Sequence, residues 1–337
     1  MKNNSRQMVV VLGAGRSGTS LLMQILVGLG VKVSENLIPA NISNPEGFFE
    51  DADIKEIHAE LISKLGSFAY LPLPDDWMSS SLARDALLKL KEALEANLNT
   101  IDGIFALKDP RINMLLPLWT RIFNQLKIVP RFILAVRTPS YVISSMIHQY
   151  NYTVGIAELV WLTRTVEALE YTMADCFIVH YEDWFADPEP LAQAVIRYTG
   201  LNENKNNLSD VLAKTVKSNL NRASHDSYEI QNPFVHKLYN ALKECHSADF
   251  NREKLMAVVK ECRQAMDGFK SWYQLAYQAN KKFVDIQSRL EKVTMEATKV
   301  PSLELRIRGL EREKVQSSQL ITQVQKLEQQ LEQLIMI

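Results

Sequence analysis

Short apolar runs alternate with longer amphipathic segments over residues 7–200 of the chain. The runs predict buried strands at Met8–Leu12, Ile104–Leu107, Phe132–Val136 and Phe177–His180. Apolar residues at three- and four-residue spacing predict helices over Thr19–Leu29, Asp53–Leu65, Leu82–Leu98, Ile112–Leu126, Tyr141–Tyr150, Ala157–Met173 and Glu189–Tyr198. This alternation is typical of a parallel sheet with helices on both faces, and ligands of such sheets bind where the strands end.

The C-terminal part of the chain follows a purely helical pattern. Residues 233–277 continue the first domain without a linker, and the tail then repeats apolar residues at three- and four-residue spacing between Gln, Glu, Lys and Arg. Pro301 and Gly309 interrupt this repeat. We therefore expect a domain over residues 1–277 and a tail over residues 278–337 that forms two short coiled-coil segments, through which the protein forms an oligomer or binds a partner protein. The alternative is one amphipathic helix that folds back on the domain. The repeating residues are Leu290, Val293, Ala297, Val300, Leu303, Ile307, Leu310, Leu320, Val324, Leu327, Leu331 and Leu334.

Composition narrows the class of protein. With 337 residues, of which 47% are apolar, the chain can bury a large core, and its net charge of −1 provides no general attraction to nucleic acid or to an anionic membrane. Its three cysteines are too scattered for a disulfide framework, and no run of residues has the length and hydrophobicity of a transmembrane helix. We therefore expect a cytoplasmic protein that binds no nucleic acid.

The turn after the first predicted strand has the composition of a phosphate-binding loop. Residues 9–29 read VVVLGAGRSGTSLLMQILVGL, in which Gly13 and Gly18 have the spacing of a P-loop, Thr19 occupies the position of the P-loop lysine, and Arg16 is the cation of the turn. Backbone N–H groups of such a turn and the positive end of the following helix dipole converge on one anion. The predicted fold is therefore an α/β, P-loop-type parallel sheet flanked by helices, with a C-terminal helical or coiled-coil extension. The candidate nucleotide-binding residues of the loop are Gly15, Arg16, Ser17, Gly18, Thr19 and Ser20.

A second anion site is predicted after the strand Phe132–Val136. Arg137 stands at the end of this strand, and Thr138 and Pro139 suit the cap and the first position of the next helix. Ser145 lies about two helical turns beyond Arg137, on the helix face that looks back at the arginine. An arginine and a hydroxyl in this arrangement can bind a phosphate group.

The segments GAGRSGTSLL and RTPSYVISS together resemble the nucleotide-binding segments of sulfotransferases that use 3′-phosphoadenosine 5′-phosphosulfate (PAPS). The resemblance implies that the first segment binds the 5′-phosphosulfate and the second binds the 3′-phosphate. The segments NPEGFFED (44–51), ALKDPR (106–111) and VHYEDWFADPEPL (179–191) are similar to parts of bacterial carbohydrate-type sulfotransferases, and the similarity extends from Gln7 to Leu201. It implies an enzyme that sulfates a hydroxyl of an acceptor, such as a glycan or glycolipid precursor.

Sulfuryl transfer also fits the residues that the loop lacks. The transferred group carries one negative charge fewer than a phosphoryl group, and magnesium is not obligatory, so this chemistry tolerates the missing lysine and the missing Walker B aspartate. We therefore expect PAPS as the co-substrate and no bound metal. Arg137 supplies a bidentate cation for the 3′-phosphate.

Transfer to a hydroxyl needs a base beside the acceptor and positive charge beside the leaving oxygen. The candidate cations are Arg16 and Lys108, which follows the second predicted strand. The resemblance supports Lys108, because other sulfotransferases place a lysine after this strand; the alternative is a solvated strand-end residue. The resemblance also implies a glutamate base after the loop helix, with Glu50 as first choice and Glu46 as second. Either glutamate could instead favour the dipole of the next helix.

Other polar residues near these segments also have structural interpretations. His58 and His148 are alternative bases, although a single histidine is more often a packed or surface residue. Asp109 and Arg111 are expected to pair with each other. The remaining candidates are Trp161 and Arg164, which face the acceptor or the core, Tyr181–Asp183, which closes the site, and Arg222, which reaches the 3′-phosphate.

Two other functions are compatible with the sequence. A P-loop kinase or nucleotide hydrolase would bind ATP with magnesium, and the missing loop lysine disfavours it. A non-catalytic scaffold would use its coiled coil to assemble a larger complex, and the intact pair of Arg137 and Ser145 disfavours it. No residue pattern names the sugar, lipid or protein that accepts the sulfuryl group.

Overall fold

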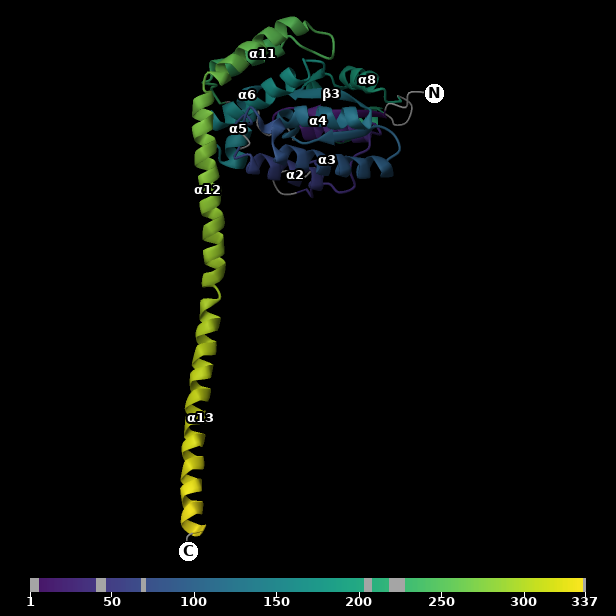
Figure 1. Ribbon diagram of the computed structural model, residues 1–337. Helices are drawn as coiled ribbons and strands as arrows, with labels where there is room; N and C mark the ends of the chain where they lie inside the picture. The colour runs from purple at the N-terminus through teal and green to yellow at the C-terminus, as the bar shows by residue number, and fades with distance from the viewer. Residues whose placement is uncertain (1–5, 41–46, 68–70, 203–207, 218–227, 336–337) are drawn as a thin grey trace. The chain divides into compact units, whose positions relative to one another are not determined.

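The computed structural model describes residues 6–40, 47–67, 71–202, 208–217 and 228–335. The chain divides into two compact units, Met1–Tyr277 and Gln278–Ile337. The first unit contains a β-sheet with helices on both faces, and the second is helical (Figure 1). The fold is therefore of the α/β class that the alternation of apolar runs predicts.

Four parallel strands form the sheet in the part of the chain that the structure describes, in the order β2-β1-β3-β4. They are β1 (Arg6–Leu12), β2 (Phe105–Lys108), β3 (Ile128–Val136) and β4 (Phe177–His180). Strands β2 and β3 lie on either side of β1, so the strand order reverses at β1. The carboxyl ends of these three strands meet at one edge, where ligands of such sheets bind.

Strand β3 begins earlier than its apolar run predicts. Residues 128–131 include Pro130 and Arg131 and lack an apolar pattern, yet they pair with β1 from Arg6 onward. Pairing with β4 starts only at Ile133, so Pro130 lies where β4 does not pair with β3. Proline is accepted in a strand mainly where one side of the strand lacks a partner, as here.

The alternating side chains of β1 separate two layers of helices. Val9 and Val11 belong to one hydrophobic core, whereas Met8, Val10 and Leu12 belong to the other. Successive side chains of a strand point to opposite faces, so an apolar strand is buried on both sides. The core of Val9 includes α1 (Thr19–Gly28), α7 (Asp183–Ala186), α8 (Pro188–Thr199) and α9 (Leu208–Thr215). The core of Met8 includes α2 (Ala52–Lys64), η1 (Trp77–Ser79), α3 (Ser81–Thr100), α4 (Ile112–Leu126), α5 (Pro139–Tyr150), α6 (Val154–Tyr171), α10 (Pro233–Leu242) and α11 (Arg252–Asp267).

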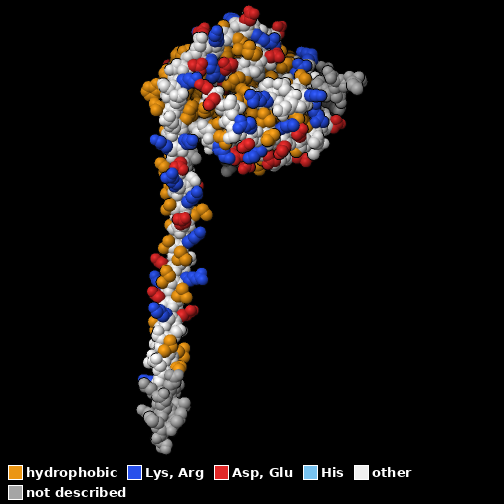
Figure 2. All heavy atoms as spheres, in the orientation of Figure 1, with side chains coloured by type: hydrophobic (Ala, Val, Ile, Leu, Met, Phe, Trp, Pro, Cys, Tyr) orange, Lys and Arg blue, Asp and Glu red, His pale blue; other side chains and the backbone are white. Residues whose placement is uncertain are grey.

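Two long helices, α12 (Lys270–Ala297) and α13 (Val300–Ile335), follow α11. The interruption expected at Pro301 and Gly309 is only partly correct, because the helices separate at residues 298–299 and α13 continues through Gly309. Proline is accepted in the first turn of a helix, and a single glycine weakens a helix by about 1 kcal/mol without ending it. Exposed apolar side chains alternate with charged ones along α12 and along the described side chains of α13 (Figure 2). No helix in the described ranges is long and apolar enough to cross a bilayer.

Candidate functional site

The predicted anion-binding loop connects β1 to α1. Gly13, Arg16 and Gly18 have φ angles of 138°, 71° and 86°, so the turn uses the left-handed backbone region that glycine adopts readily. The buried side chain of Asn113, on α4, accepts a hydrogen bond from Gly13 N (3.3 Å) and donates one to Gly13 O (2.8 Å). Helix α1 begins at Thr19 without a side-chain cap, and the first N–H groups of a helix have no acceptor within it. The N-terminal end of α1 is therefore a candidate anion-binding position.

A tyrosine ring packs directly against the loop. The loop residues Ser17 and Thr19 are buried, whereas Gly15, Arg16, Gly18 and Ser20 are half-buried. A Cβ atom added at Gly18 would lie 2.2 Å from Cδ2 of Tyr181, which follows β4. Only glycine leaves room for this ring, so the loop and the end of β4 are in close contact.

The second predicted anion site lies beside the loop. Nε of Arg16 donates a hydrogen bond of 2.9 Å to Oγ of Ser145, and NH1 of Arg137 donates one of 3.4 Å to the backbone oxygen of Arg16. Ser145 thus contacts the loop arginine, whereas the sequence suggested only that it faces Arg137. Residues from the ends of β1 and β3 therefore form one basic region.

Arg137 is 7% exposed and stacks on an aromatic ring. Its Cζ atom lies 4.2 Å from the centroid of the Tyr181 ring, which is a cation–π contact. Burial lowers the pKa of Arg137, while Tyr181 and Glu182 act in the opposite direction. Arginine nevertheless keeps its charge, because its ordinary pKa is far above neutrality. The end of β3 therefore carries a buried positive charge.

Thr138 does not cap α5 with its side chain, although Pro139 is the first residue of α5 as expected. The backbone N and Oγ1 of Thr138 instead donate to Oε1 of Glu182, at 3.0 and 2.8 Å. Oγ1 of Thr138 also lies 2.9 Å from the hydroxyl of Tyr239. Glu182 and the ring of Tyr181 thus connect the segment after β4 to the second anion site.

Lys108, at the end of β2, forms a buried ion pair with Glu50. Nζ of Lys108 donates to Oε1 of Glu50 at 2.8 Å and to the backbone oxygen of Phe48 at 2.9 Å. The two side chains are 4% and 9% exposed, so Lys108 is not a solvated residue at a strand end. Arg111 supplies a second cation, with NH1 3.5 Å from Oε2 of Glu50. The candidate base and a candidate leaving-group cation are therefore direct neighbours.

The residue that caps α2 is Asp51 rather than Glu50. Oδ1 of Asp51 accepts a hydrogen bond of 2.8 Å from the backbone N of Ile54, in the first turn of α2. The alternative role of Glu50 at the helix start is therefore taken by its neighbour. Glu46 and Arg222 lie outside the described residues.

His58 is fully buried, and both of its ring nitrogens have partners. Nδ1 lies 2.9 Å from Oδ2 of Asp109, and Nε2 accepts a hydrogen bond of 3.0 Å from Nε1 of Trp119. Asp109 also accepts a hydrogen bond from Arg111, so these two residues pair as expected. With both nitrogens occupied, His58 is not placed to take a proton from a substrate. His148, the other alternative base, is exposed on α5.

The candidate residues of α6 belong to the protein interior. Trp161 and Arg164 are 1% and 3% exposed, which agrees with the core interpretation of Trp161. Burial lowers the pKa of Arg164 to about 10, and burial raises the pKa of Glu167 to about 7. Within the described ranges, no three His, Cys, Asp or Glu side chains are grouped so as to hold a metal ion.

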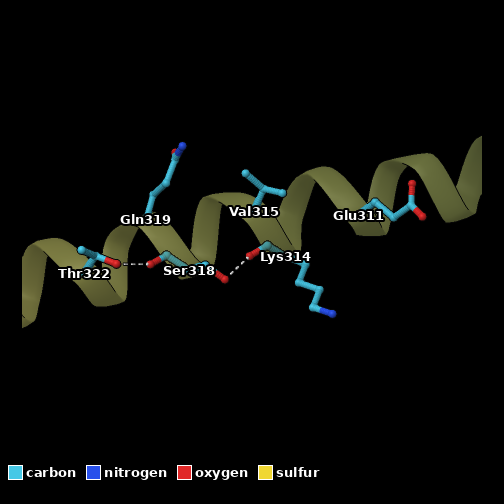
Figure 3. Close-up of a pocket in the computed structure, with 6 residues that line it drawn as sticks. All are labelled: Glu311, Lys314, Val315, Ser318, Gln319 and Thr322. Atoms are coloured by element: carbon cyan, nitrogen blue, oxygen red, sulfur yellow. Dashed lines mark hydrogen bonds between the residues drawn. The ribbon is translucent and has the colours of Figure 1, made fainter.

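A hollow on α13 lies far along the chain from these residues. Figure 3 shows its lining, with Val315 and Gln319 on one side of the helix and Lys314 on the other. The six lining residues all come from one helix, and Ser318 and Thr322 use their hydroxyls to bond backbone oxygens of that helix. A single helix cannot enclose a small molecule, so the sheet edge is the candidate site.

The chain is similar to known sulfotransferases. The sequence profile of the Sulfotransferase family matches residues 8–205, which span β1 to β4 and every described candidate residue. A solved sulfotransferase domain from the Synechococcus PCC 7002 olefin synthase is 16% identical, with a TM-score of 0.42 over 77% of this chain and 94% of that domain. One from the curacin biosynthetic pathway is 13% identical, with a TM-score of 0.41 over 76% of this chain and 97% of that domain. No curated protein matches the sequence. Because the family profile covers more than half of the chain, the protein belongs to the sulfotransferase family and is a sulfotransferase enzyme.

Proposed function

We propose that this sulfotransferase takes its sulfuryl group from PAPS and transfers it to a hydroxyl of a glycan or glycolipid precursor. In this proposal the loop of Gly15–Ser20 binds the 5′-phosphosulfate, and Arg137 and Ser145 bind the 3′-phosphate. The hydrogen bond from Arg16 to Ser145 carries the proposal, because it joins the two segments into one basic region. A single nucleotide with phosphates at both ends of its ribose fits two adjacent anion sites.

The residues around the end of β2 suit the chemistry of the transfer. Glu50 takes the proton of the acceptor hydroxyl, whose oxygen then attacks sulfur as the bond from sulfur to the 5′-phosphate oxygen breaks. Arg16 and Lys108 stabilise the negative charge that develops on that leaving oxygen. Before substrates bind, Lys108 is neutralised by Glu50. Developing charge on the leaving oxygen therefore competes with Glu50 for Lys108.

The acceptor is proposed from sequence alone. The segments 44–51, 106–111 and 179–191 resemble those of carbohydrate-type enzymes, and Glu50, Lys108 and Tyr181 come from these segments. Radiolabelled donor incubated with separated glycan, glycolipid and protein fractions of the cell envelope identifies the class. Label found only in the protein fraction would contradict a glycan or glycolipid acceptor and would indicate a protein acceptor instead.

Calorimetry with the product nucleotide, 3′-phosphoadenosine 5′-phosphate, tests the donor. We expect binding without magnesium, and much weaker binding of ATP with magnesium. Because the loop has threonine where a kinase has lysine, Thr19→Lys should strengthen ATP binding and so reduce the difference in affinity between the two nucleotides. Tighter binding of ATP with magnesium by the unaltered protein would support a kinase or hydrolase instead.

We also propose that a second copy of the chain covers the apolar residues of α12 and α13. Leu290, Val293, Leu303, Ile307 and Leu310 are all between 55% and 63% exposed, and charged residues surround them. Burying such a seam against an identical helix is favourable, because each copy supplies the apolar surface that the other lacks. Light scattering should show fewer copies of the chain per particle after removal of the residues beyond Tyr277, and nucleotide binding should be retained. A monomeric full chain would contradict this assembly.

A further inference from the structure

A connected series of polar side chains runs from the interior of α4 to Glu50. Trp119 donates to His58, His58 contacts Asp109, Asp109 accepts from Arg111, and Arg111 contacts Glu50. His58 and Asp109 are 0% and 1% exposed. The series passes from the buried face of α4 to the proposed base.

The hydrogen bond from Nε1 of Trp119 determines which ring nitrogen of His58 carries the proton. An indole nitrogen can only donate, so Nε2 of His58 is an acceptor and carries no proton. A neutral imidazole then has its proton on Nδ1, which donates to Oδ2 of Asp109. The other oxygen of Asp109, Oδ1, accepts from the backbone N and from NH1 of Arg111, both at 2.8 Å. Both oxygens of Asp109 are therefore occupied.

Asp109 stays ionised in this environment. Burial by itself would raise its pKa, but Arg111 and His58 outweigh burial and hold the pKa of Asp109 below its ordinary value. Burial would likewise lower the pKa of Arg111, while Asp109 and Glu50 raise it. Arg111 is thus a permanent cation that is shared between two carboxylates.

We propose that His58 and Asp109 are positioning residues that set how Arg111 is shared between Asp109 and Glu50, so that Arg111 and Lys108 bind different oxygens of Glu50. Lys108 contacts Oε1 and Arg111 contacts Oε2. A carboxylate held at both oxygens has one orientation, which favours proton transfer in a fixed geometry. The inference rests on the proposed role of Glu50 as the base.

The test measures the pKa of Glu50 by NMR in the full chain with isotope-labelled glutamate carboxyl carbons. The signal is assigned by its loss in Glu50→Gln. The charged groups that contact Glu50 are Lys108 and Arg111. Arg111 is paired with Asp109, and Arg164 of α6 interacts electrostatically with both Arg111 and Asp109. Asp51 follows Glu50 in the chain.

Two variants should move this pKa in opposite directions. Arg111→Met removes a neighbouring cation and should raise the pKa of Glu50. Asp109→Asn frees Arg111 to bind Glu50 alone and should lower it. Arg111→Met also leaves the buried carboxylate of Asp109 without its cation, so the NMR spectrum of this variant is first used to check that it folds. Unchanged values, or shifts of the same sign, would overturn the proposal.

His58 offers a matched pair of variants of similar size. His58→Asn keeps an N–H donor near the position of Nδ1, whereas His58→Leu removes it. Without this donor, Asp109 draws Arg111 away from Glu50, so His58→Leu should raise the pKa of Glu50. In His58→Asn the pKa of Glu50 should stay closer to that of the unaltered protein. Equal effects of the two variants would mean that His58 acts through packing only.

Nucleotide binding separates this inference from the proposed function. Calorimetry with 3′-phosphoadenosine 5′-phosphate should give affinities within about threefold of the unaltered protein for all four variants, because none of them changes the basic region of Arg16, Arg137 and Ser145. Failure of the unaltered protein to bind would contradict the donor, while the NMR shifts would still report whether the network acts on Glu50.

Discussion

Nε of Arg16 donates a hydrogen bond of 2.9 Å to Oγ of Ser145, although 129 positions separate the two residues. The contact exists because β1 and β3 are neighbours in the sheet, so the loop after β1 and the helix after β3 begin side by side. A guanidinium held by a hydroxyl has a restricted set of orientations. Arg16 is therefore prepared to meet an anion before the anion binds.

Ser145→Ala should weaken binding of 3′-phosphoadenosine 5′-phosphate by about tenfold, because a hydrogen bond to a charged group is lost. Calorimetry measures the change. Ser144→Ala is the matched control, since Ser144 is the buried neighbour of Ser145 on α5 and is not part of the proposed contact. Equal losses for the two variants would mean that α5 packing, and not the hydroxyl of Ser145, matters.

Arg137→Ala should weaken binding of the 3′-phosphorylated nucleotide by about thirtyfold, because a charge-assisted contact with the 3′-phosphate contributes about 2 kcal/mol. Adenosine 5′-phosphosulfate, which lacks the 3′-phosphate, should bind almost unchanged. Arg137→Lys keeps the charge but loses the forked donor geometry, and its affinity should be intermediate. The same loss for both ligands would place Arg137 elsewhere in the site.

Glu50→Gln should lower turnover by about a hundredfold and leave the affinity for 3′-phosphoadenosine 5′-phosphate close to unchanged, because a general base acts on the acceptor proton and not on the nucleotide. Incorporation of labelled sulfuryl groups into the accepting fraction gives the rate. Glu56→Gln, an exposed position on α2, is the control. A normal rate would assign the base to Glu46 or to a histidine.

Gly18→Ala should lower the free energy of unfolding by about 1–3 kcal/mol, because the new Cβ meets the ring of Tyr181 in a left-handed backbone conformation. Gly15→Ala should be close to neutral, since nothing lies within 4 Å of a Cβ there. Urea unfolding of both variants measures the difference. Similar stability of the two would show that the loop moves easily away from Tyr181.

Glu167 makes the stability of the protein depend on pH. Burial raises its pKa from 4.5 to about 7, so the folded state binds this proton more tightly than the unfolded chain does. Its stabilising contribution is complete below the unfolded pKa and is lost as pH rises through the folded value. The free energy of unfolding of Glu167→Gln, relative to the unaltered protein, should rise by up to about 3 kcal/mol between pH 4.5 and 7. Denaturant titrations that show a constant difference over this range would contradict the raised pKa.

Much of the fold could be predicted from the sequence because it depends on local patterns. Helix α4 has the bounds of its predicted segment, Ile112–Leu126, and all four predicted strands are present. The first residues of β3 were missed because Pro130 and Arg131 break the apolar run, and only pairing with β1 makes them a strand. The sequence also located the loop, because Gly13 and Gly18 mark its turn.

The contacts of the candidate site depended on distant segments. Asn113 holds Gly13, and Tyr181 covers Gly18, yet a lone asparagine on a helix and a tyrosine after a strand carry no pattern that indicates these roles. The network of His58 and Asp109 is likewise invisible in sequence, because its members come from α2 and from the end of β2. Polarity alone did not distinguish these partners from surface residues.

The sequence by itself determined where each strand ends and which residues follow it, because apolar spacing and glycine turns are patterns that extend over only a few residues. Only the tertiary structure decided that Arg16 contacts Ser145 and that Lys108 contacts Glu50. The physical reason is the strand order β2-β1-β3, which brings three strand ends to one edge. Local forces do not set that order, because it depends on how the helices between the strands pack on the two faces of the sheet.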